Sequence, residues 1–122
     1  SSISQIKQIA ANETVGYDRA WTAGKDTTIG IIPIGYADGL SRRLSNGRGH
    51  LLVNGHSVPI IGNVCMDMCM ADITTIPAKE GDNVSVFGKD ISITQFAKKA
   101  NRTEYEVLTG ISQRVKRIFV QN

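Results

Sequence analysis

An Asn-Gly pair constrains the fold of this chain more than any other local feature. Asn54-Gly55 lies at the centre of an apolar region over residues 50–61, and Asn-Gly between two apolar runs is the strongest short-range signal of a β-hairpin. Residues 27–36 are rich in β-branched residues and almost uniformly apolar, which is typical of a strand buried on both faces. Residues 64–73 predict a further strand. The chain is therefore expected to be mainly β.

Helical signals occur only late in the chain. Thr94 is placed to cap one short helix, and Thr103 with Glu106 three residues later has the form of a capping box. Residues 114–120 return to a strand pattern. These elements predict one domain over residues 1–122, a closed or partly closed β-barrel with two short helices near its C-terminus.

Composition and charge narrow the possible functions. The chain has 122 residues, a net charge of +3 and 6% aromatic residues. Its basic residues are scattered among acids and do not alternate with aromatic side chains, so a nucleic-acid partner is not expected. No apolar run approaches the roughly 20 residues that a membrane helix needs, and no signal-peptide pattern is present. We therefore expect a cytoplasmic protein without a membrane partner.

The two cysteines, Cys65 and Cys69, lie in the predicted strand over residues 64–73. Four residues of strand would separate them by about 13 Å, beyond the limit of about 7 Å for a disulfide. His50 and His56 are not placed to complete a zinc site. We expect reduced thiols and no metal.

Three stretches of the sequence carry a family resemblance, and they occur in the order and at the spacing of that family. They read Val-Gly-Tyr-Asp-Arg-Ala-Trp-Thr-Ala over residues 15–23, Ile-Pro-Ile-Gly-Tyr-Ala-Asp-Gly over 32–39, and Gly-Asn-Val-Cys-Met-Asp over 62–67. They are similar to blocks in the C-terminal β domain of the alanine racemase family. The resemblance covers nearly the whole chain.

The resemblance implies a specific activity. Members of the family are homodimers that depend on pyridoxal phosphate (PLP) and interconvert L- and D-alanine for peptidoglycan synthesis. Each subunit has an N-terminal (β/α)8 barrel bearing the Schiff-base lysine, and the active site forms where this barrel meets the β domain of the partner subunit. This chain resembles the β domain alone. The barrel is thus expected to be absent from it, and the isolated chain to be inactive.

The resemblance also assigns roles to individual residues. Tyr17 matches the catalytic tyrosine, the base that removes the Cα proton of L-alanine. A phenol with a pKa of about 10 is a poor base near neutral pH, so a cation must stabilise the phenolate, and we expect the barrel to supply it. Tyr36 and Met66 match substrate-binding positions, Tyr36 at the entrance near the cofactor and Met66 through its backbone N–H. Arg42 matches an entrance arginine.

Structural interpretations of these residues stay open. Tyr36 could pack at the rim of the barrel, Asp38 is first interpreted as a turn residue, and Arg42 could be a solvated surface charge. Cys65 is interpreted as a small buried hydrophobic residue.

The sequence also departs from the family pattern. Asn63 stands where many members have arginine, and Gln113 replaces a tyrosine near the cofactor phosphate. Gln113 is still expected to bind the cofactor by hydrogen bonding its phosphate, and serine stays open as an additional substrate. A non-catalytic β-barrel binding module is the alternative function; oligonucleotide binding by a small barrel lacks the stacking aromatics it needs.

Overall fold

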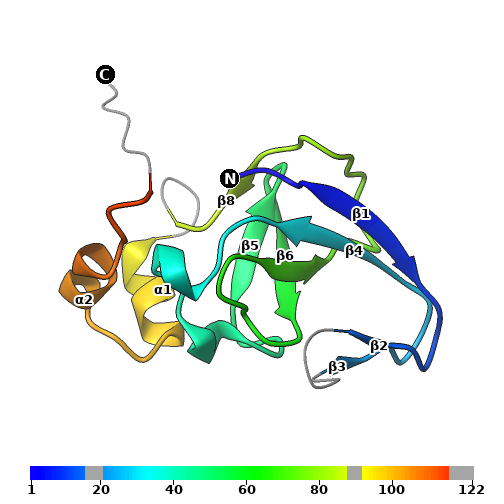
Figure 1. Cartoon of the computed structure of the whole chain (residues 1–122), viewed down its shortest axis with the longest axis horizontal. Helices are drawn as coiled ribbons and strands as arrows, with labels where there is room; N and C mark the ends of the chain where they lie inside the picture. Colours follow the sequence, from blue (N-terminus) through cyan, green and yellow to red (C-terminus); the bar gives the residue numbers. More distant parts are fainter. Residues whose placement is uncertain (16–20, 88–91, 116–122) are drawn as a thin grey trace.

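The computed structural model describes residues 1–15, 21–87 and 92–115 (Figure 1). Its strands are β1 (Gln5–Ile9), β2 (Thr14–Val15), β3 (Trp21–Thr22), β4 (Thr27–Ile32), β5 (His50–Val53), β6 (His56–Ile61), β7 (Cys69–Asp72) and β8 (Val84–Ser85). Its helices are α1 (Ile93–Lys99) and α2 (Glu104–Thr109), with two 3-10 turns, η2 (Tyr36–Asp38) and η3 (Arg42–Leu44), before β5. Figure 1 shows α1 and α2 together at one end of the molecule and the β2–β3 pair at the other.

The main sheet has six antiparallel strands in the order β1-β4-β7-β6-β5-β8. The expected mainly β fold with two short late helices is confirmed, but the closed barrel is wrong, because β1 and β8 are the two edges of this sheet. β8 spans only two residues, which pair with β5, and Val84 N donates to Ser1 O ahead of β1. The described residues that precede the two edge strands meet in a single bridge between Ser2 and Asn83, beside a 3.0 Å hydrogen bond from Ile3 N to Asp82 O.

The β5–β6 hairpin forms as predicted. Asn54 and Gly55 have φ angles of 50° and 82°, and this left-handed backbone at both turn positions is what Asn-Gly tolerates and most residues do not. Pro59 lies within β6 and does not break the β5–β6 pairing. The Ile60 N–H donates to Gly49 O, so the neighbouring Pro59 nitrogen faces β7. Pairing with β7 begins only at Ile60, and the missing Pro59 N–H costs no ladder bond.

Two predicted strands are shorter than the sequence indicated. The strand expected over residues 27–36 ends at Ile32, directly before Pro33, which has no N–H to continue the ladder. The strand expected over residues 64–73 covers only Cys69–Asp72. Cys65 N donates to Met68 O in a tight turn instead, so the strand-based distance between the two cysteines does not apply. Both thiols are free.

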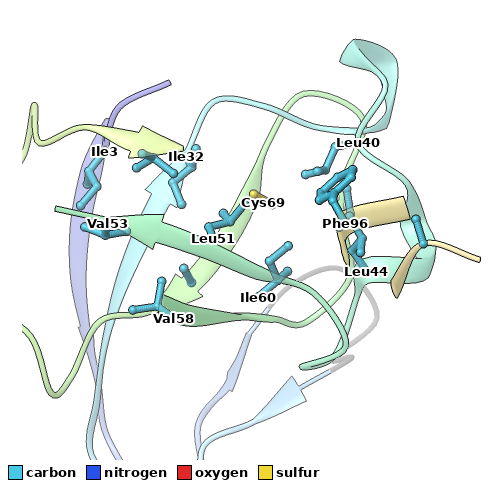
Figure 2. Packing of buried hydrophobic residues seen from close by; sticks show 14 of the residues in the cluster. Ile3, Ile32, Leu40, Leu44, Leu51, Val53, Val58, Ile60, Cys69 and Phe96 are labelled. Atoms are coloured by element: carbon cyan, nitrogen blue, oxygen red, sulfur yellow. The ribbon is translucent and has the colours of Figure 1, made fainter. Parts of the chain in front are cut away.

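The core lies between the sheet and α1. Figure 2 shows Ile3, Val53 and Val58 at one end of this core, Leu40, Leu44 and Phe96 at the other, and Leu51, Ile60 and Cys69 between them. A second, smaller cluster of Ile29, Ile61 and Met70 buries part of the other face. This accounts for β4, in which buried and half-buried residues share both faces. The fixed core gives the loops at the helical end of the sheet a rigid support.

Capping side chains fix the two helices. The capping box of α2 is confirmed: Thr103 Oγ1 accepts from Glu106 N (3.1 Å), and Glu106 Oε1 accepts from Thr103 N (3.0 Å). The first helix begins earlier than predicted, because Ser92 and not Thr94 caps it by accepting from Gln95 N. In the described part of the chain, no helix has the length and apolar character needed to cross a membrane.

Candidate functional site

A tight turn and a loop from distant parts of the sequence lie against each other. We call residues 35–39 the Tyr36 turn and residues 62–68 the Met66 loop. Tyr36 N donates to Cys65 O over 2.9 Å, and Ala37 N donates to Met66 O over 3.0 Å. Backbone hydrogen bonds therefore set the separation of the two segments.

Glycine makes this close approach possible. A Cβ atom at Gly35 would overlap the Cys65 carbonyl oxygen and lie 2.5 Å from Met66 O. The φ angle of Gly35 is −142°, which any residue adopts, so the need for glycine there is purely one of space. Gly39 differs, because its φ is +110° and an added Cβ would also lie 2.5 Å from Gly110 O. This second contact brings the segment after α2 against the Tyr36 turn.

An arginine connects these segments through its side chain. Arg114 Nε donates to Asp38 Oδ1 over 2.6 Å, and its Nη2 donates to Asp67 Oδ1 over 2.7 Å. We call Arg114, Asp38 and Asp67 the Arg114 cluster. Residues 110–115, the Arg114 segment, are held further by a 3.2 Å bond from Ser112 N to Asp38 O. One guanidinium thus joins three parts of the chain.

Asp38 is the most enclosed member of the Arg114 cluster. Its side chain is 13% exposed, against 48% for Arg114 and 61% for Asp67. Arg114 binds one of its carboxylate oxygens and Gly35 N–H the other, at 3.0 Å. The Arg114 guanidinium, acting against the effect of burial, holds the pKa of Asp38 below its usual range. The two carboxylates in turn raise the pKa of Arg114. Asp38 is therefore a charged anchor in addition to a turn residue.

The predicted site residues that the structure describes lie on or beside these segments. Tyr36 is 46% exposed and Met66 is 52% exposed, so neither side chain is consumed by the core. The Arg42 guanidinium carbon lies 5.7 Å from the centre of the Tyr36 ring, a cation–π distance. Gln113 is exposed and directly precedes Arg114. Tyr17, the predicted catalytic residue, lies outside the described residues.

The position of Asn63 shows what its departure from the family pattern does here. Asn46 Nδ2 donates to Asn63 Oδ1 over 3.2 Å, and the adjacent Val64 N donates to Ser45 Oγ over 2.8 Å. The Met66 loop is thereby tied to the end of η3 through neutral groups, where a charged side chain was expected from the family.

Sequence reasoning missed the Arg114 cluster. Asp38 was interpreted as a turn residue, and Arg114 was placed in a strand over residues 114–120. Arg114 and Val115 lie in a turn instead, and residues 116–120 lie outside the described part of the chain. The available signal was proximity in sequence: each charged residue stands within two positions of a residue already assigned to the site.

Fold and site together define a mainly β domain whose candidate site lies on loops beside an open six-stranded sheet. The family described as "Alanine racemase, C-terminal domain" matches residues 1–119. The chain therefore belongs to the alanine racemase C-terminal domain family, as its three sequence blocks predicted.

Individual relatives agree with this assignment. The chain is 40% identical over 121 residues to the alanine racemase of Deinococcus deserti, covering 98% of this chain and 34% of that protein. The solved alanine racemase of Bartonella henselae, with covalently bound pyridoxal phosphate, matches with a TM-score of 0.93 and 34% identity over 98% of this chain and 34% of that one. The Bacillus anthracis alanine racemase with bound L-Ala-P gives a TM-score of 0.92 and 36% identity, over 99% of this chain and 32% of that one. The chain spans about a third of the length of these relatives.

Proposed function

We propose that this chain is the C-terminal β domain of a PLP-dependent alanine racemase, which interconverts L- and D-alanine for peptidoglycan synthesis in the cytoplasm. The observation that carries the proposal is the family match over residues 1–119. In the full-length protein an N-terminal (β/α)8 barrel would precede this domain. Two subunits would then form a homodimer in which each β domain completes the active site of its partner.

Within that dimer we assign Tyr17 as the catalytic base that removes the Cα proton of L-alanine. Racemisation takes a proton from one face of Cα and returns it to the other, so it needs a proton carrier on each side. Tyr17 would serve one face, and a lysine of the barrel the other. A phenolate is stable near neutral pH only beside a positive charge, which we assign to the barrel.

The remaining assignments rest on the loop surface. Exposed Tyr36 and Met66 would bind substrate, Met66 through its backbone N–H, and Arg42 would line the entrance. Tyr36 is 46% exposed and Met66 is 52% exposed, so a substrate or a partner subunit can reach both residues. Gln113 would hydrogen-bond the cofactor phosphate.

The described residues do not fit a PLP molecule on their own. Gln113 is exposed, and the neighbouring Arg114 directs its Nε and Nη2 to Asp38 and Asp67. The chemistry of the cofactor would therefore come from a site held mainly by the barrel.

Exchange of the α-hydrogen in heavy water tests the role of Tyr17. The equilibrium constant between enantiomers is one, so kcat/KM must fall equally in both directions in any variant. Exchange can still differ between the two faces. In the full-length protein, Tyr17→Phe should abolish racemisation and exchange from L-alanine, while D-alanine keeps exchanging its α-hydrogen. Near-normal racemisation by this variant would refute the assignment.

Further measurements test whether the β domain needs the barrel for activity and which amino acids the full-length protein racemises. The isolated chain should show no turnover with alanine and no PLP absorbance band after dialysis. Turnover by the chain alone would overturn the proposal. Serine, which Gln113 keeps open as an additional substrate, is tested by comparing kcat/KM for alanine and serine in the full-length protein. A full-length protein that racemises neither amino acid would favour the binding module.

A further inference from the structure

The Arg114 cluster is placed where it can control the geometry of the proposed site. Each of its members has an assigned site residue as a near neighbour in sequence: Tyr36 for Asp38, Met66 for Asp67, and Gln113 for Arg114. We propose that Arg114 is a positioning residue, which holds the Tyr36 turn, the Met66 loop and its own segment in the arrangement that substrate binding requires. This inference rests on the proposed racemase function.

The exposure of two members of the Arg114 cluster distinguishes this role from an ordinary contribution to stability. Exposed ion pairs add little to the free energy of unfolding, and the side chains of Arg114 and Asp67 are 48% and 61% exposed. Replacing Arg114 should therefore leave the global fold intact. Asp38 differs because it is 13% exposed and is bound at both oxygens. It provides a fixed point from which the guanidinium reaches the more open Asp67.

The shape of the guanidinium makes the connection rigid. Nε and Nη2 belong to one planar group, so the Asp38 and Asp67 carboxylates are held at a set distance and direction from each other. A lysine in the same place would bring a single point of positive charge. It could attract both carboxylates but would not fix their relative orientation.

The three segments depend on Arg114 to different degrees. The Tyr36 turn and the Met66 loop already share two backbone hydrogen bonds, from Tyr36 N and Ala37 N. Those bonds end at Met66 O, and the next residue, Asp67, is held by Arg114. Loss of the guanidinium would therefore free the Asp67 side chain, which lies between the backbone hydrogen bonds at Met66 O and Met68 O. Asp67 directly follows Met66, the residue whose backbone is proposed to contact the substrate.

Kinetics of the full-length protein test this role. Arg114→Gln should raise KM for alanine roughly tenfold, since a misplaced Met66 N–H would weaken its proposed hydrogen bond to the substrate carboxylate, and a hydrogen bond to a charged group contributes about that much to affinity. Arg114→Lys should recover part of this loss. A purely structural defect would lower the amount of active enzyme, and so the apparent kcat, with KM unchanged. Arg48→Gln is the control, because Arg48 is exposed and forms no ion pair in the described part of the chain.

A second variant keeps the test decisive if Arg114→Gln folds poorly. Asp67 is 61% exposed, so Asp67→Asn should fold normally and raise KM in the same direction, by a smaller factor. A KM within twofold of wild type for every folded variant of Arg114 and Asp67 would overturn the proposal.

A spectroscopic readout separates this inference from the proposed function. In full-length protein labelled with ¹³C at its methionine methyl groups, the Met66 signal is assigned by its loss in Met66→Leu. Arg114→Gln should shift that signal, and Arg48→Gln should not. If the wild-type protein fails to racemise alanine but the Met66 signal still shifts, the proposed function fails, while the structural part of the inference, that Arg114 holds the Met66 loop in place, stands. An unshifted Met66 signal in Arg114→Gln rejects the positioning role regardless of activity.

Discussion

The amide of Tyr36 donates to the carbonyl oxygen of Cys65 over 2.9 Å, which places a residue of the proposed substrate site directly on the backbone of the Met66 loop. The contact exists because Gly35, one position earlier, has no side chain to separate the two segments. Any side chain at position 35 would therefore push the Tyr36 turn and the Met66 loop apart.

Gly35→Ala should destabilise the protein by about 1–3 kcal/mol, the usual cost of forcing an extra carbon into a closely packed place. The new Cβ would overlap Cys65 O and crowd Met66 O, so the Tyr36 turn must move off the loop. Urea denaturation measures the change. Gly24→Ala is the matched control, since nothing lies within 4 Å of a Cβ at Gly24, and it should change the free energy of unfolding by less than about 0.5 kcal/mol. Equal midpoints for the two variants would contradict the packing argument.

The Asp38 carboxylate should make stability depend on pH. Its pKa in the folded chain is lowered by Arg114, so its contribution is fully present above the unfolded pKa of about 3.9 and is lost as pH falls through the lower folded value. Asp38→Asn should therefore be less stable than wild type near neutral pH, and the difference should shrink as the pH falls below about 4. Urea midpoints at several pH values give the measurement. A difference that stays constant over that range would show that Asp38 is not held as a charged anchor.

Glu80→Gln serves as the control for the Asp38 series. Glu80 is exposed, and its carboxylate forms no ion pair in the ranges that the structure describes. The stability difference between this variant and wild type should be small at every pH tested.

The two cysteines should differ in reactivity. Burial raises the pKa of the Cys69 thiol to about 12, and this side chain is fully enclosed, whereas Cys65 is partly exposed. Because the thiolate is the reactive form, an alkylating reagent near pH 8 should modify Cys65 in the native protein and Cys69 only after unfolding. Peptide mass spectrometry follows both sites. Equal native rates at the two positions would mean that Cys69 is more open than the packing of β7 indicates.

The capping box of α2 should contribute measurably to stability. Thr103→Ala removes the acceptor for Glu106 N and should lower the free energy of unfolding by about 1 kcal/mol. Thr75→Ala, in an exposed turn after β7, is the control and should have little effect. If thermal melting shows no difference between the two variants, α2 is held by packing instead of by its cap.

Local signals in the sequence were sufficient for the elements they govern. Asn54-Gly55 determines its hairpin because the turn needs positive φ at both positions, and Thr103 with Glu106 determines a helix start through bonds within four residues. The apolar pattern was misleading where apolar side chains are exposed in a loop, as Met66 and Met68 are. Residues 64–68 resemble a strand, yet Cys65 and Met68 close a turn there. No signal in the sequence indicated that the sheet stays open, because the length of the edge strand β8 is decided by its pairing in the folded chain.

The Arg114 cluster could not be predicted from local pattern. Arg114 is separated from Asp38 by 76 positions and from Asp67 by 47, and an isolated acid or base in a turn has no periodicity to reveal its partner. The family blocks identified the segments that matter. They did not indicate that side chains beside the assigned site residues bind one another.

Those separations also affect the order in which the molecule takes shape. Closing a long stretch of chain costs more entropy than closing a short one, and on the ribosome the earlier strands emerge well before residue 114. The hairpin and the centre of the sheet can therefore form while the Tyr36 turn and the Met66 loop still lack their shared arginine. We expect the proposed substrate-binding surface to be among the last parts of the chain to reach its final shape. A nascent or truncated chain that ends before Arg114 would then have a formed sheet, while its Tyr36 turn and Met66 loop would not yet be joined by a side chain.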